Sequence, residues 1–437
     1  MPKSKAYKSS IYLSSFIAPI VIFIAFVFLF SIAYADSSAL SLGKILEEAL
    51  KNNPQINAAK GRYDAALARV TLLRTLSDPK FEYEYDKITA DMDAVMNGKT
   101  GPMRTFAISQ EVPFPTKLFT RKQVAQSQAN SFEQEYRETE RKIIKEVKEA
   151  FSRLFLISKK IIVTEENLAL LSQFVEVANK KYEVGKANQE DVLRAQVEYS
   201  KLSNELVLLD QEKQISQAML NFLLNRPQDS PMEINEAKDN KDFSIDEKKV
   251  LELTKENRPE LKSFKEMLAR SKIEYSLAKQ EYLPDFMFKY KREERNGGAG
   301  EWAGMVGMTI PLWFFEKQNS FVKEAKANVE VAKAEHSAIE ASALFETKSA
   351  YAKFEASKKL VKIYETGVLP QAKAALETAR RAYSADKIDL LQLLDSERTL
   401  RDFQIEYFES LANLEIALAD LERSVGADLN KQIVDGR

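Results

Sequence analysis

Two matched sets of prolines divide most of this chain into two similar halves. Pro54 and Pro259 each open a helical stretch, and a second proline lies 25 residues later in both cases, at Pro79 and Pro284. Proline lacks an amide hydrogen and disfavours helix in the residue before it, so each of these prolines starts or ends an element. The spacing predicts an internal repeat in which each half runs helix, strand, strand, long helix, tip and helix.

The repeat predicts where the parts of the chain begin and end. We expect a first repeat over residues 36–235, a polar linker over 228–246, a second repeat over 247–426 and a tail over 427–437. Residues 1–35 have the pattern of a secretory signal peptide, with lysines, an apolar run and a small-residue cleavage site. An uncleaved anchor helix is the alternative interpretation of that leader.

The helical stretches are far longer than a globular domain needs. Residues 117–182 are predicted as one helix, which would extend ~100 Å at about 1.5 Å per residue. Elsewhere apolar residues recur every three or four positions, as at Leu414, Leu418, Leu421 and Val425, which is the pattern of a coiled-coil seam. The sequence therefore predicts a mainly α fold with a small β part, built on long antiparallel coiled-coil helices.

Four short segments alternate apolar and polar residues with a period of two. They cover about residues 80–87, 103–112, 285–292 and 302–310, close to the length of a tilted strand that crosses a membrane. One face of each segment is apolar and the four faces together are rich in aromatic residues, as expected for contact with the lipid of an outer membrane. The predicted lipid-facing residues are Phe81, Tyr83, Tyr85, Phe106, Ile108, Phe286, Phe288, Tyr290, Trp302 and Val306.

Four strands cannot close into a membrane-spanning sheet by themselves. Every backbone polar group must be paired in lipid, and the smallest bacterial barrels have about eight strands. Two copies of the chain would supply about eight strands and three copies about twelve, and the residues alone do not choose between them. The alternative is a set of water-soluble hairpins that pack on the helices, in an exported coiled-coil rod or adaptor protein of the cell envelope.

The composition excludes several classes of function. The chain has no cysteine and one histidine, so disulfides, thiolate metal sites and a cysteine nucleophile are excluded, and we expect no metal and no cofactor. A net charge of −1 does not indicate a nucleic-acid partner. The sequence has no Gly-rich phosphate loop and no nucleophile elbow, so we expect no enzymatic activity.

Together these features resemble the TolC-type outer-membrane efflux channels. The duplicated helix and strand pattern, QEVPFPTKL at 110–118 and YEVGKANQEDVLRAQ at 182–196 carry the resemblance, which covers about residues 40–426. It implies a homotrimer whose twelve-stranded β-barrel lies in the outer membrane and continues as an α-barrel through the periplasm. It also implies a passive exit duct for compounds that an inner-membrane pump delivers through a periplasmic adaptor. QEVPFPTKL resembles the branch associated with heavy-metal cation efflux, although the residues leave the exported compound open.

The resemblance assigns a role to two helical tips, at about residues 183–189 and 384–388. Val184, Gly185 and Lys186 match the patch of the first tip that contacts the adaptor, and Ala385 and Asp386 match it in the second tip. Glycine suits a tight turn because it tolerates positive φ. The second tip has no glycine at the matching position, and lysine replaces the family's usual apolar third residue, so we expect the choice of adaptor to differ from that of the family.

The resemblance also implies a pore constriction and a clasp between the tips. The acidic positions of the family's constriction match Gln392 and Asp395, so that Asp395 alone would form an acidic ring around the pore. The family's tips are held shut by an aspartate of the first tip with a tyrosine and a basic residue of the second. Asp191 and Tyr383 match two of these positions, and Lys387 is the candidate for the third.

Overall fold

A computed structural model describes residues 41–86, 96, 102–232, 245–295 and 299–429 of the chain. The expected signal peptide, most of the expected linker and the end of the tail lie outside these residues. The chain divides into a small unit, Met1–Ser41 with Pro231–Glu236, and a main unit that holds the rest. The main unit contains every helix and strand described below.

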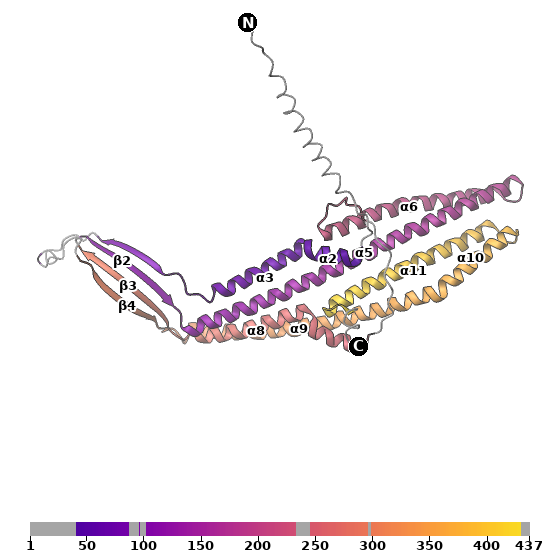
Figure 1. Cartoon of the computed structure of the whole chain (residues 1–437). Coiled ribbons are helices and arrows are strands. Elements are labelled where there is room, and N and C mark those ends of the chain that lie inside the picture. The colour runs from indigo at the N-terminus through magenta and orange to yellow at the C-terminus, as the bar shows by residue number, and fades with distance from the viewer. Residues whose placement is uncertain (1–40, 87–95, 97–101, 233–244, 296–298, 430–437) are drawn as a thin grey trace, which may run out of the picture. The chain divides into compact units, whose positions relative to one another are not determined.

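The main unit is mostly helical, with strand pairs between its helices (Figure 1). The first half contains α2 (Leu42–Asn52), α3 (Pro54–Leu72), β1 (Lys80–Asp86), β2 (Met103–Val112), α5 (Pro115–Glu183) and α6 (Gln189–Leu224). The second half contains α7 (Glu247–Asn257), α8 (Pro259–Gln280), β3 (Asp285–Arg295), β4 (Glu301–Thr309), α9 (Lys317–Ile363), the π-helix η1 (Tyr364–Val368), α10 (Leu369–Ser384) and α11 (Leu390–Val425).

Prolines mark the helix ends, as the sequence predicts. Helices α3, α5 and α8 each begin with a proline in the first turn, where its missing amide hydrogen costs nothing. The long helical stretch that ends near Tyr383 is not continuous, because a turn of π-helix separates α9 from α10. Pro370 lies just beyond this turn and cannot donate the next helical hydrogen bond, which explains the irregularity.

The helices lie side by side in the same order as the strands that they join. The sheet is antiparallel with the order β1-β2-β3-β4, and α3, α5, α8 and α9 pack side by side in that order beyond one end of the sheet (Figure 1). Toward the tips, α6 replaces α3 beside α5, and α11 replaces α8 between α5 and the α9–α10 pair. Helix α5 therefore extends from the helices near the sheet, α3 and α8, to the helices near the tips, α6 and α11. Its 69 residues make it about 100 Å long.

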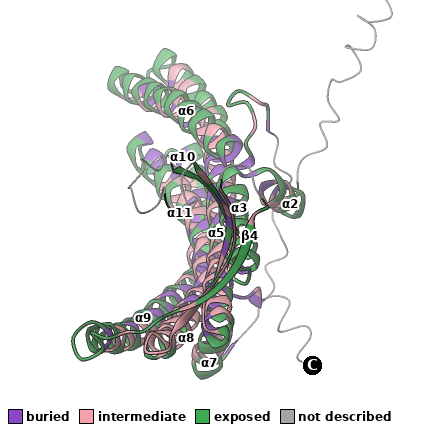
Figure 2. Cartoon of the chain, turned by 90° about the vertical axis from the view of Figure 1, so that its left-hand side faces the viewer, coloured by how far each residue is buried: buried purple, intermediate pink, exposed green. Residues whose placement is uncertain are grey.

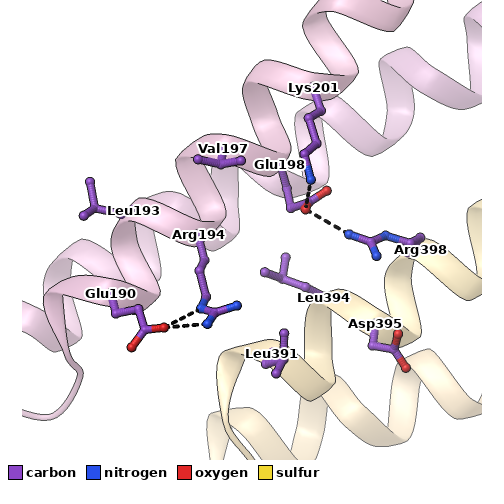
Figure 3. A pocket seen from close by; sticks show the side chains of 10 residues that line it. All are labelled: Glu190, Leu193, Arg194, Val197, Glu198, Lys201, Leu391, Leu394, Asp395 and Arg398. Carbon is purple, nitrogen blue, oxygen red and sulfur yellow. Dashed lines mark hydrogen bonds and ion pairs between the residues drawn. The ribbon is translucent and has the colours of Figure 1, made fainter.

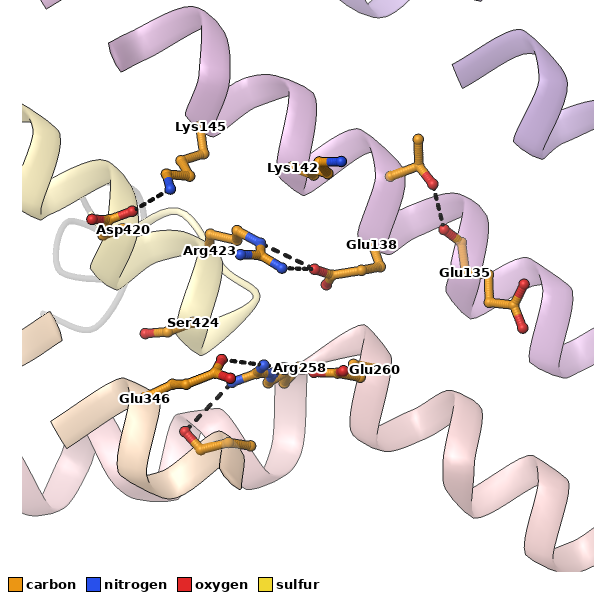
Figure 4. A network of polar contacts seen from close by, with 12 residues as sticks. Glu135, Glu138, Lys142, Lys145, Arg258, Glu260, Glu346, Asp420, Arg423 and Ser424 are labelled. Carbon is orange, nitrogen blue, oxygen red and sulfur yellow. Dashed lines mark hydrogen bonds and ion pairs between the residues drawn. The ribbon is translucent and has the colours of Figure 1, made fainter. Parts of the chain in front are cut away.

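The middle of the unit, where α11 ends and α8 begins, is tightly packed. Gly426 ends α11 with a φ of 78°, and a Cβ atom there would lie 2.7 Å from the α-carbon of Arg258 and 2.8 Å from the carbonyl oxygen of Asn257. The buried Arg258 guanidinium bridges the carboxylates of Glu260 and Glu346 (Figure 4). Only glycine fits at position 426, because backbone atoms that cannot move aside surround it.

Charged pairs join other helices at the same level. Arg423 of α11 donates to Glu138 of α5 at 2.9 Å, and Lys145 of α5 pairs with Asp420 of α11 at 2.8 Å (Figure 4). Burial raises the pKa of the Glu138 carboxyl, and Arg423 opposes that rise. These pairs hold α11 against α5 at the level where the helices near the sheet give way to the helices near the tips.

Apolar side chains form two main clusters along the helices. One gathers around Leu418, Leu421 and Val425, on the seam that the sequence predicts, and includes Ala427 and Leu429 of the expected tail. The other lies near the tips and joins α5, α6, α10 and α11. Figure 2 shows that buried residues run along the helix interfaces, whereas β4 is largely exposed.

No helix in the described part of the chain combines the length and the apolar character needed to cross a bilayer.

Candidate functional sites

The four strands place the predicted aromatic residues on one face of the sheet. Phe81 pairs with Ile108 and Tyr83 pairs with Phe106, so that residues of β1 and β2 share a face. Ile108 in turn pairs with Tyr290. Phe288 pairs with Val306, and Arg292 with Trp302, which carries the same face through β3 and β4. Directly paired residues of an antiparallel sheet project on the same side, so the aromatic side chains form a continuous surface.

This aromatic face is exposed in the single chain. Phe81 and Val306 are 71% and 72% exposed, and Tyr83, Tyr290 and Trp302 are each more than half exposed. Ring contacts continue across strands, with the centroids of Tyr83 and Phe106 and those of Tyr290 and Trp302 both 5.1 Å apart. An apolar surface of this extent normally lies against another molecule or a lipid phase.

The face is not wholly apolar, which the sequence pattern did not indicate. Arg292 lies on it as the pairing partner of Trp302, with its guanidinium carbon 5.0 Å from the centroid of that ring. Arg292 also forms an ion pair with Glu294, two residues further along β3. The positive charge of Arg292 is thus balanced by Glu294, and its guanidinium lies over the ring of Trp302.

The opposite face of the sheet is polar. Lys289 of β3 forms an ion pair with Glu82 of β1, and Lys291 pairs with Glu293. Thr105 and Ala107 of β2 lie between these charged residues and line a shallow hollow with them. The sheet therefore has one apolar and one charged side, as the alternation predicts.

A buried lysine connects the sheet to the helices. Lys117 is 1% exposed, and its Nζ atom donates to Asp285 at 2.9 Å and to the carbonyl oxygen of Leu283 at 3.0 Å. The backbone N–H of Phe114 donates to the same Asp285 carboxylate at 2.9 Å. These contacts link the start of α5 to the start of β3 and give a structural reason for the PFPTK sequence. The pattern of the sequence did not single out Lys117 or Asp285.

An aromatic run follows β4 and was also missed. Leu312, Trp313, Phe314 and Phe315 are all more than half exposed, and the ring of Phe315 contacts those of both Trp313 and Phe314. These residues lie between the end of β4 and the start of α9. The unbroken apolar composition of the run was the signal that could have identified it.

The two helical tips have the same backbone geometry. In the first, the N–H groups of Gly185 and Lys186 donate to the carbonyl oxygens of Tyr182 and Lys181, at 3.0 and 2.7 Å. The matching groups of the second tip, Asp386 and Lys387, donate at 3.2 and 2.9 Å in the same pattern. Gly185 has a φ of 70° and Asp386 a φ of 56°. Aspartate tolerates this left-handed conformation better than most residues, which explains how the second tip forms without glycine.

A lysine of the first tip joins the two tips. The Nζ atom of Lys181 donates to the Asp386 carboxylate at 2.5 Å and to the carbonyl oxygen of Tyr383 at 3.0 Å, and lies 4.0 Å from the centroid of the Tyr383 ring. Burial raises the pKa of the Tyr383 phenol, with Asp191 and Asp386 adding to the rise and Lys181 opposing it. The hydrogen bond from Lys181 lowers the pKa of Asp386.

This arrangement differs from the clasp expected from the sequence. Lys181 occupies the place expected of Lys387, because the end of α5 points Lys181 toward Tyr383 while Lys387 is exposed at the turn. Among the described residues, no hydrogen bond or ion pair joins Lys387 to Asp191. The Asp191 carboxylate instead accepts the backbone N–H of Asn188 at 3.3 Å and caps the start of α6. The Tyr383 ring lies beside Lys181 at the end of α5.

The residues expected at the pore constriction lie at the start of α11. Gln392 and Asp395 are both exposed, and the backbone N–H of Gln392 donates to the carboxylate of Asp389, which caps the helix. Asp395 and the nearby Leu394 line a groove between α6 and α11 (Figure 3). The adaptor-contacting residues expected at the tips, Val184 to Lys186 with Ala385 and Asp386, are also exposed.

Comparison with known proteins identifies the family. The model of the outer membrane efflux protein family matches residues 45–226 and again 250–427. The chain belongs to the outer membrane efflux protein family. This efflux protein is therefore a transport channel of the outer membrane, with its helices in the periplasm.

Several relatives resemble the efflux protein over much of its length. The cobalt-zinc-cadmium resistance protein CzcC of Cupriavidus metallidurans is 23% identical over 283 residues, which are 64% of this chain and 67% of CzcC. The outer membrane protein TolC of Vibrio cholerae is 20% identical over 417 residues, 91% of this chain and 93% of TolC. The crystal structure of the Campylobacter jejuni CmeC outer membrane channel matches with a TM-score of 0.76 at 16% identity, covering 90% of this chain and 88% of CmeC.

Proposed function

We propose that three copies of this efflux protein form one passive exit duct, in which their strands close into a twelve-stranded barrel in the outer membrane. The observation that carries the proposal is the exposed aromatic face, which extends across all four strands, with Arg292 as a charged residue near one end of β3. Strands β1 and β4 are the two edges of the sheet and need partners in lipid. Neighbouring copies supply these partners, and the charged face then lines the water-filled interior.

The α helices continue the duct as a trimeric α-barrel through the periplasm. Each copy is a duplicated unit, because both halves run through the same order of helices and strands and the family model matches each half separately. One long helix per half, α5 and the α9–α10 pair, extends from the sheet to a tip. The exposed tip residues Val184 to Lys186, with Ala385 and Asp386, contact a periplasmic adaptor that links the duct to an inner-membrane pump.

The contacts between the tips hold the duct closed at rest. In this clasp Lys181 binds Asp386 and covers the ring of Tyr383, and Asp191 lies close enough to raise the pKa of that tyrosine. Asp395 of each copy projects at the constriction, where a ring of carboxylates favours cations. Heavy-metal cations are the proposed cargo, supported by the resemblance to a protein named for cobalt, zinc and cadmium resistance.

Single-channel recording of the purified protein in planar bilayers tests the duct. We expect small conductance for the wild type and a larger one for Lys181→Met, because the substitution removes the charge that joins the tips. Lys180→Met is the matched control, since Lys180 pairs with Glu176 within the same helix. Absence of pores in all three proteins would exclude the duct. That result would favour an exported coiled-coil rod or adaptor. Such a protein can be extracted from the cell envelope without detergent, whereas a membrane-embedded barrel cannot.

A further inference from the structure

A groove of about 350 Å³ separates α6 from α11 just beyond the tips (Figure 3). Its walls carry apolar side chains from both helices, among them Leu193 and Val197 of α6 with Leu391 of α11, and each of these three is 53% exposed. The two helices belong to different halves of the chain, and α5 lies beside both of them. A change in the separation of α6 and α11 would therefore change the spacing of the two tips.

One ion pair spans this groove. The Glu198 carboxylate of α6 accepts from Arg398 of α11 at 2.9 Å, and it also accepts from Lys201 of its own helix at 2.9 Å (Figure 3). The Glu198 side chain is 19% exposed and that of Arg398 is 47% exposed. The pair is thus partly sheltered, yet water reaches it from one side.

Glu198 carries its charge throughout the neutral pH range. Burial raises the pKa of its carboxyl, but the hydrogen bonds from Lys201 and Arg398 outweigh burial and lower it below the usual value. A second ion pair in the same groove, Glu190 with Arg194, lies entirely within α6. Of these two pairs, Glu198–Arg398 holds one helix to the other and Glu190–Arg194 does not.

We infer that Glu198 and Arg398 form a latch that holds α6 and α11 together while the tips are closed and that separates when the duct opens. The inference rests on the proposed function and adds positioning residues that lie inward of the tip clasp. A partly exposed ion pair suits this role, since water replaces the partners at little cost when they part. A fully buried pair would oppose opening far more strongly.

Bilayer recordings of the full-length protein test the latch. We expect Glu198→Gln and Arg398→Gln each to raise the mean conductance by about 1.5- to fivefold, the range that a weak, partly sheltered ion pair allows. Exchange of the charges, Glu198→Arg with Arg398→Glu and with Lys201→Glu so that position 198 keeps an opposite charge on its own helix, should return most of the closed state. Arg194→Gln removes a similar charge from the same groove and should leave the conductance unchanged.

The outcomes separate the latch from the duct itself. Pores with wild-type conductance in both single variants, or an equal rise in Arg194→Gln, would overturn the latch and leave the duct standing. An exchange variant that conducts as strongly as the single variants would also overturn it. Absence of pores in every protein, Lys181→Met included, would overturn the proposed function and the latch with it.

A covalent link keeps the test decisive if a single substitution impairs folding. The chain has no cysteine, so Glu198→Cys with Arg398→Cys introduces the only two thiols. Joining them with a short bifunctional maleimide should return the conductance of this variant to the wild-type value. A linked protein that conducts as freely as the unlinked one would contradict the latch.

Discussion

The middle of this efflux protein and its tips both depend on charge, but they place it differently. In the middle, the Arg258 side chain is 4% exposed and is held between Glu260 and Glu346. At the tips, the Lys181 side chain is 18% exposed, and it binds Asp386, whose side chain is 56% exposed. A buried charge that loses its partner is costly, whereas an exposed pair exchanges its partner for water at little cost. If the tips open as proposed, we therefore expect the middle to stay together while the contacts between the tips separate.

The largest expected effect on stability is at the junction of α8 and α11 in the middle of the unit, and it tests how tightly that junction is packed. Gly426→Ala should lower the free energy of unfolding by about 2–4 kcal/mol, because the new Cβ atom meets backbone atoms of Arg258 and Asn257 at a φ of 78°. Thermal unfolding in detergent, followed by circular dichroism, measures the change. Gly61→Ala is the control, since open space surrounds Gly61 in α3, and it should stabilise by about 0.5–1 kcal/mol. Equal effects at the two positions would show that the junction of α8 and α11 is not tightly packed.

A buried carboxyl near the tips, that of Glu397, is expected to make the free energy of unfolding depend on pH, with an effect of intermediate size. Glu397 is 3% exposed, and burial raises its pKa from 4.5 to about 7 against the opposing charges of Arg401 and Arg398, while Asp402 and Glu198 add to the rise. The folded protein thus binds this proton more tightly than the unfolded chain does. Stability should fall as the pH rises from 4.5 to about 7 and change no further above that range.

Glu397→Gln isolates this carboxyl. The amide cannot ionise, so the variant should be more stable than the wild type by about 2–3 kcal/mol at alkaline pH and nearly equal to it at acid pH. Melting curves over a series of pH values give the comparison, and Glu406→Gln, on the exposed side of α11, serves as the control. A constant difference between variant and wild type across the series would contradict the role of ionisation.

The smallest effect on stability is expected at the second tip. Asp386→Asn keeps a residue that tolerates positive φ and removes the charge that Lys181 binds. The melting temperature should stay within error of the wild type while the conductance rises, because the contact holds the tips and not the fold. A drop in melting temperature as large as that of Gly426→Ala would remove the distinction between the two regions.

Much of the fold could be predicted because local chemistry decides it. Pro54 and Pro259 place the starts of α3 and α8, and the alternation of apolar and polar residues places β1 to β4. The coiled-coil seam near Leu418 is also visible as a spacing of three and four. Each of these signals acts over one element, where backbone geometry alone links sequence to structure.

The contacts between elements could not be predicted in the same way. Lys181 and Tyr383 are 202 positions apart, and Lys117 and Asp285 are 168 apart. A resemblance in sequence pointed to Lys387 as the basic residue near Tyr383, whereas among the described residues Lys181 at the end of α5 makes that contact. The direction of a side chain is set by the rotation of its helix against its neighbours.

By itself, the sequence determined the order of helices and strands, the two matched tips and a sheet with one aromatic and one charged face. These follow from proline, glycine and periodicity, which act on the backbone nearby. The tertiary structure alone decided which charges meet, namely Lys181 with Asp386, Lys117 with Asp285 and Glu198 with Arg398. Such pairs form only when the packing of distant helices brings their side chains within reach, and no local pattern records that packing.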